Sequence, residues 1–160
     1  MQATWIVAAN AGRARVFSQA NAAEPLEEIH DMVNTAARLR TGETETDALG
    51  QRAASKSRHS VGAPTPPSGY EPHQSPAEHQ TEIFAKTLAG FLAHAHQEGR
   101  FNRLCIVAAP EFLGMLRKLL KPPLVSTVKL EIDKDYTHFN ARQLHERIKR
   151  KRFSSDANAG

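Results

Sequence analysis

Histidine and aspartate side chains that could carry out metal chemistry lie in two distant stretches of the chain. His73 and His79 flank the start of a predicted helix, and Asp133 lies in a turn near the C-terminal end. Imidazole and carboxylate groups bind transition metals, and a bound metal activates water for hydrolysis. However, the spacing of these residues does not repeat in the way that is typical of metal ligands. Histidines at a helix start are commonly capping or solvent-exposed residues, and an aspartate in a turn commonly caps the backbone. We therefore expect no metal or other cofactor, and keep a metal-dependent hydrolase at His73, His79 and Asp133 as an alternative.

The longest predicted helix and the strand after it organise the fold. Ser75 and Glu78 form a capping box with Pro76 at the first helical position, and Gly99 is the expected stop. Between them, apolar residues recur at steps of three and four, which predicts one buried stripe. Residues 104–109 show no polar alternation, which is typical of a strand covered on both faces. This combination predicts an α/β domain.

Shorter patterns on either side complete the order of elements, which is β-β-β-α-β-α-β-α. This order predicts a three-layer α/β fold with a five-stranded mixed sheet, an antiparallel meander followed by crossovers. The arrangement is ribonuclease H-like, and the release-factor middle domain is a variation on it. A metal nuclease is not expected, because Asn10 stands where an acid would be needed. The expected strands are residues 4–9, 14–19, 26–33, 104–109 and 125–132, and the expected helices begin at Ser75, Pro110 and Asn140.

We expect one domain over residues 1–152, with a long flexible loop at 41–74 and a disordered tail at 153–160. The loop is rich in Gly, Ser, Thr, Pro and charge and cannot bury enough apolar surface to offset its ordering entropy. It contains Gly50 and Gln51 at the position where release-factor middle domains carry a Gly-Gly-Gln loop. Gln51 is thus an alternative catalytic residue, for peptidyl-tRNA hydrolysis on the ribosome. A single Gly-Gln pair is more typical of a solvated linker.

The predicted topology brings several polar residues to one edge of the sheet. The first, third, fourth and fifth strands run in the same direction, and binding sites of open α/β sheets form where such strands end. We therefore expect a non-enzymatic binding module that presents these residues to an anionic or RNA partner. The candidate binding residues are Arg13, His73, His79, Asp135 and His138.

Composition restricts the class of protein further. The chain has 160 residues and a net charge of +4, and residues 142–152 alone carry +5, so the rest is close to neutral. A short basic run is more often a solvated helix end than a binding patch. Cys105 is the only cysteine and lies in an apolar strand, which indicates a buried residue in a reducing compartment. With no signal peptide or membrane span apparent, we expect a cytoplasmic protein that binds neither membrane nor DNA.

Nearly the whole chain resembles the bacterial host attachment protein family, whose members are required for attachment to host cells. That family is similar to bacterial relatives of the release-factor middle domain, which agrees with the predicted topology. The resemblance implies a role in attachment, which we expect to be indirect, but no particular reaction or ligand. The expectation of an RNA or ribosomal partner comes from the basic residues of the loop. The most specific segments are residues 72–79, 101–104, 109–117 and 134–138, which read PHQSPAEH, FNRL, APEFLGMLR and KDYTH. The polar residues that carry the resemblance are Arg13, Arg15, His73, His79, Arg117, Lys134, Asp135 and His138.

Overall fold

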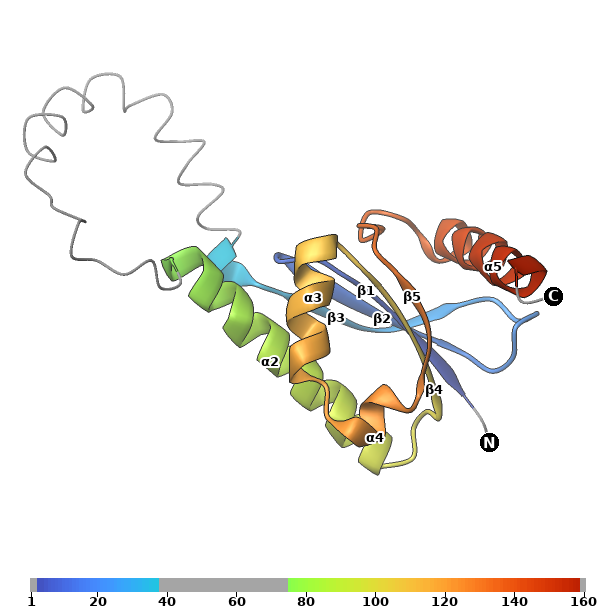
Figure 1. Cartoon of the computed structure of the whole chain (residues 1–160), viewed down its shortest axis with the longest axis horizontal. Coiled ribbons are helices and arrows are strands. Elements are labelled where there is room, and N and C mark those ends of the chain that lie inside the picture. The colour runs from blue at the N-terminus through green and yellow to red at the C-terminus, as the bar shows by residue number, and fades with distance from the viewer. Residues whose placement is uncertain (1–2, 38–74, 159–160) are drawn as a thin grey trace, which may run out of the picture.

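The computed structural model describes residues 3–37 and 75–158, which form a five-stranded sheet with helices on both faces (Figure 1). The predicted α/β class and mixed five-stranded sheet are confirmed. The predicted loop at 41–74, with Gln51 and His73, lies outside the described residues. The strands are β1 (Thr4–Ala9), β2 (Arg13–Gln19), β3 (Glu27–Val33), β4 (Arg103–Ala108) and β5 (Val128–Ile132), and the helices are α2 (Pro76–Gln97), α3 (Pro110–Leu119), α4 (Pro122–Val125) and α5 (Ala141–Asn158).

The sheet has the strand order β3-β2-β1-β4-β5. β1 pairs antiparallel with β2, and β2 pairs antiparallel with β3. β1 and β4 pair in parallel, as do β4 and β5. β1, β3, β4 and β5 therefore run in one direction, as predicted, and their carboxyl ends lie at one edge of the sheet.

Alternate residues of the central strands supply the two cores of the domain. Trp5 and Val7 of β1 pack in a cluster with α2 and α3, whereas Ile6 and Ala8 pack in a second cluster with Leu144 and Ile148 of α5. Successive side chains of a strand point to opposite faces, so a central strand without polar residues is covered on both sides. α2 and α3 thus form one outer layer and α5 forms the other (Figure 1).

Capping residues mark both predicted ends of α2 and the predicted start of α5. The Ser75 hydroxyl accepts the backbone N–H of Glu78 at 3.1 Å, and Gly99 follows α2 with a φ of +71°. Such a positive φ is cheap only for glycine, so Gly99 ends the helix as expected. At α5, the backbone N–H of Asn140 donates to the Gln143 side chain, and the backbone N–H of Gln143 donates to the Asn140 side chain. Asn140 and Gln143 therefore form a reciprocal capping box at the predicted start of α5, whereas at α2 the structure shows the Ser75 half of the predicted box.

Two boundaries differ from the sequence prediction. Val125 was expected in the fifth strand but belongs to the short helix α4, because Pro122 opens a new helical turn instead of only ending α3. β5 accordingly starts at Val128. α5 continues to Asn158, through residues expected in a disordered tail. None of the helices in the described part of the chain is both long and apolar enough to cross a membrane.

Candidate functional site

The turn after β1 is joined to the loop after β5 by the side chain of Asn10. Its Oδ1 accepts the backbone N–H groups of Gly12 and Arg13, both at 2.8 Å. Its Nδ2 donates to Asp135 Oδ2 at 2.9 Å and to Thr137 Oγ1 at 3.1 Å. All the hydrogen-bonding groups of the Asn10 side chain are therefore used. Asn10 shapes the β1–β2 turn and fastens the β5–α5 loop to it.

Asp135 is held at the same edge by three neighbouring groups. Its Oδ1 accepts the Thr137 hydroxyl at 2.6 Å and the Thr137 backbone N–H at 3.1 Å, in addition to the Asn10 contact. Partial burial would raise the pKa of Asp135, but the hydrogen bonds from Thr137 and Asn10 and the proximity of His138 outweigh it, so the pKa is lowered. Asp135 is thus an ionised capping residue, which is a poor general acid.

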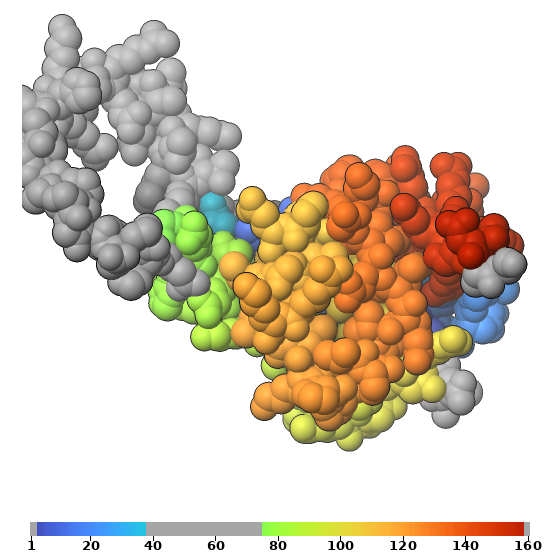
Figure 2. Space-filling view, in the orientation of Figure 1, coloured from blue at the N-terminus to red at the C-terminus, as the bar shows by residue number. Residues whose placement is uncertain are grey.

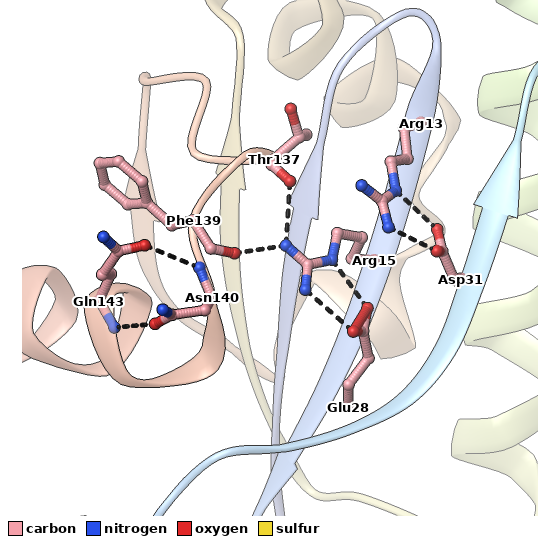
Figure 3. A network of polar contacts seen from close by, with 8 residues as sticks. All are labelled: Arg13, Arg15, Glu28, Asp31, Thr137, Phe139, Asn140 and Gln143. Carbon is pink, nitrogen blue, oxygen red and sulfur yellow. Dashed lines mark hydrogen bonds and ion pairs between the residues drawn. The ribbon is translucent and has the colours of Figure 1, made fainter.

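The predicted binding residue Arg13 is paired with a neighbouring strand at the surface of the sheet. Its guanidinium makes a bidentate contact with Asp31 of β3, at 2.9 Å and 2.6 Å (Figure 3). Such a fork-to-carboxylate contact neutralises the charge and fixes its orientation. An anionic ligand at Arg13 would have to compete with Asp31.

Arg15 is a buried charged member of this polar network, although the sequence suggested no site role for it. It is 9% exposed, and its Nε and Nη2 donate to the two carboxylate oxygens of Glu28 at 2.7 Å and 2.9 Å. Its Nη1 donates to the backbone carbonyls of Thr137, at 3.0 Å, and of Phe139 (Figure 3). Arg15 therefore clamps the edge strand β3 and the β5–α5 loop onto β2, which sets the starting position of α5.

The other predicted site residues lie on different layers. Asp133, Asp135 and His138 share the β5–α5 loop, and all three are exposed. His79 is exposed in the first turn of α2, the helix packed on the opposite face from α5. Its side chain makes no hydrogen bond or ion pair with any residue the structure describes. The common binding surface of Arg13, His73, His79, Asp135 and His138 stays a prediction.

The alternative metal and catalytic sets depend in part on residues outside the described ones. Over residues 3–37 and 75–158, no group of three or more His, Cys, Asp or Glu side chains could hold a metal ion. The set His73, His79 and Asp133 includes one residue beyond this range, and Gln51 is also beyond it. Cys105 is buried in β4, and this burial raises the pKa of its thiol to about 12, which makes it unreactive.

Helix α5 carries the excess positive charge of the chain. Its six Arg and Lys residues and two acidic residues give +4, which equals the charge of the whole protein. Its side chains form part of the outer surface in the space-filling view, coloured red (Figure 2). Only Leu144 and Ile148 are buried, so most of the helix surface faces solvent. The exposed cations are Arg142, Arg147, Arg150 and Lys151.

The outward face of α5 also offers an aromatic ring and a concave surface. Phe153 is 74% exposed, the largest value among the exposed large hydrophobic residues of the described chain. Arg142, Lys149 and Phe153 are spaced by seven and four residues, which puts them on one helical face. A hollow of about 450 Å³ lies between α5 and the β2–β3 turn, beside the contact of His145 with the Ala22 carbonyl, and Arg142, His145 and Lys149 line its α5 side. The sequence signal for this surface was the helical spacing of Arg142 and Lys149, which puts them on a different side of the helix from the apolar residues Leu144 and Ile148.

Comparison with known proteins identifies a family for most of the chain. Residues 5–148 match the family model described as protein required for attachment to host cells. No curated protein matches the chain. The matched span covers the sheet, α2, α3, α4 and the first part of α5, and Lys149 and Phe153 lie beyond it.

Proposed function

The chain belongs to the family of proteins required for attachment to host cells, and from this premise we propose that it is a non-enzymatic binding protein for single-stranded RNA. The proposed contact surface is the outward face of α5 and the hollow beside it. Attachment of cells to a host is then an indirect consequence of RNA binding. The observation that supports this proposal most strongly is that Arg142 and Lys149, which line the hollow, share a helical face with the exposed ring of Phe153.

The proposal assigns separate roles to the charged and aromatic side chains. Arg142 and Lys149 would contact phosphates, since lysine and arginine supply most of the affinity for nucleic acids. Phe153 would stack on a base, as aromatic side chains do in sequence-tolerant binding of single strands. The 450 Å³ hollow is large enough to receive an unstacked base.

The carboxyl edge of the sheet supports a binding role over an enzymatic one. Asn10 and Asp135 use their polar atoms to hold the β1–β2 turn and the β5–α5 loop together. Arg13 and Arg15 are both engaged by carboxylates of β3. These contacts make a rigid support for α5, in which each of these side chains has a structural partner.

We also propose that the fold is ribonuclease H-like, with the release-factor middle domain as a variation. The strand order β3-β2-β1-β4-β5 and the helices on both faces support this assignment. The proposed RNA surface lies on the α5 layer and does not include the carboxyl edge of the sheet.

The test measures binding of a fluorescent single-stranded RNA by anisotropy over a range of salt concentrations. We expect the double variant Arg142→Gln/Lys149→Gln to bind more weakly, with a salt slope reduced by about 1.4, because each phosphate contact on a single strand contributes about 0.7. The matched control is Lys118→Gln/Lys121→Gln, which removes two exposed lysines in and after α3. Equal affinities for the two variants, or no RNA binding by the parent protein at low salt, would overturn the proposal.

A further inference from the structure

We propose that a second cavity, at the opposite edge of the sheet from the carboxyl ends, binds a phosphomonoester of mononucleotide size. This cavity has a volume of about 520 Å³ and lies between the starts of β4 and β5, the β2–β3 turn and the C-terminal end of α5. These elements gather at the right-hand end of the molecule in Figure 1. The proposal goes beyond RNA binding because it concerns a different cavity and a small ligand.

The cavity has a positive rim. Arg103 of β4, Lys129 of β5 and Arg152 of α5 line it, and among the described residues Asp156 is the only acidic one that does. Within the described part of the chain none of the three cations forms an ion pair. Cations held on three separate elements around one hollow favour a ligand with more than one negative charge.

The floor of the cavity is apolar. Cys105 and Leu130 line it from the α5 side of the sheet, and Cys105 is almost completely buried. Small-molecule sites typically enclose about 300–1,000 Å³, with apolar walls and a few charged groups that fix the orientation of the ligand. A phosphate at the rim with an apolar or aromatic group on the floor matches this distribution. A nucleoside monophosphate has both parts and the appropriate size.

The test is isothermal titration of the full chain with AMP, and separately with adenosine and inorganic phosphate. We expect AMP to bind more tightly than either, because only AMP fills both the rim and the floor. Arg103→Gln/Arg152→Gln should weaken AMP binding at least tenfold, and Ala20→Trp, which adds bulk at the exposed wall of the cavity, should abolish it. Lys118→Gln/Lys121→Gln is the charge-matched control and should bind AMP normally.

Any of the following three outcomes would contradict the proposal. No heat with AMP at millimolar concentration, or unchanged AMP binding in both cavity variants, would remove the site. Inorganic phosphate binding as tightly as AMP would show that only an adventitious anion is bound. A 5′-phosphorylated trinucleotide that binds more tightly than AMP would assign the cavity to an RNA end instead of a free nucleotide.

Failure of this site is distinguishable from failure of the RNA-binding proposal. Arg142 and Lys149 do not line the 520 Å³ cavity, so their double variant should lose RNA affinity and keep AMP binding. Arg103→Gln/Arg152→Gln changes the cavity itself and is judged on AMP binding alone.

Discussion

Replacing Arg15 by methionine removes the guanidinium that joins β2 to β3 and to the β5–α5 loop while keeping an apolar side chain of similar length. Four hydrogen bonds are lost, two to the Glu28 carboxylate and two to the carbonyls of Thr137 and Phe139. Breaking a buried ion pair by removing one partner costs about 3–5 kcal/mol. Glu28 keeps about a third of its side chain exposed, so water compensates part of the loss. We expect the free energy of unfolding to fall by about 3 kcal/mol, at the lower end of that range.

The assay is urea denaturation followed by circular dichroism at several pH values. The hydrogen bonds from Arg15 lower the pKa of Glu28 below its ordinary value of 4.5. A lowered folded-state pKa contributes stability above the unfolded pKa, and this stability is lost as pH falls through the folded pKa. The difference between the parent protein and Arg15→Met should therefore be full at pH 7 and shrink below about pH 4.5.

Glu28→Gln is the matched variant because it keeps the shape of the carboxylate and removes its charge. We expect it to be less damaging than Arg15→Met, since the contacts of Arg15 with the two carbonyls remain. A loss below about 1 kcal/mol for Arg15→Met at pH 7, typical of an exposed pair, would refute the reasoning. A loss that is the same at pH 3 and pH 7 would also refute it.

Three further predictions concern the turn residue Asn10, the helix cap Ser75 and the buried thiol of Cys105. Asn10→Ala removes four hydrogen bonds and should lower the free energy of unfolding by about 2 kcal/mol. The control Asn21→Ala, in an exposed turn, removes one such bond and should lower it far less, so equal thermal shifts for the two variants would contradict the prediction. Ser75→Ala removes the side-chain cap of α2 and should lower the free energy of unfolding by about 1 kcal/mol in urea denaturation. Ser75→Asp keeps a capping oxygen and should be close to the parent protein, so an equal loss of stability in both variants would show that the cap contributes nothing. Cys105 should not react with a thiol reagent at pH 8 until the protein is unfolded in urea, because burial raises its pKa to about 12; rapid reaction of the native protein would contradict this placement.

Local patterns in the sequence were sufficient to predict the sheet and most helix boundaries. Ser75 and Gly99 mark the ends of α2 through backbone chemistry that acts within a few residues. The unbroken apolar run of β4 reports burial on both faces. Pro122 was ambiguous, because a proline stops one helix and equally suits the first turn of the next.

The polar network and the α5 surface could not be predicted in the same way, because they depend on contacts between distant residues. Arg15 is separated from Thr137 by 122 positions, and a charged residue in a strand gives no local sign of burial. Phe153 was expected in a disordered tail because the basic run before it is typical of a solvated end. Only the continuation of α5 to Asn158 places the ring beside the cations.

Crosslinking of a thiouridine-containing single-stranded RNA, followed by glutamate-specific digestion and mass spectrometry, tests the proposed RNA surface most directly. Cleavage after Glu146 leaves the rest of α5 in one peptide, which contains Lys149 and Phe153. We predict that crosslinks concentrate in this peptide and disappear in Arg142→Gln/Lys149→Gln. Crosslinks confined to peptides of α2 and α3 would contradict a binding surface on α5.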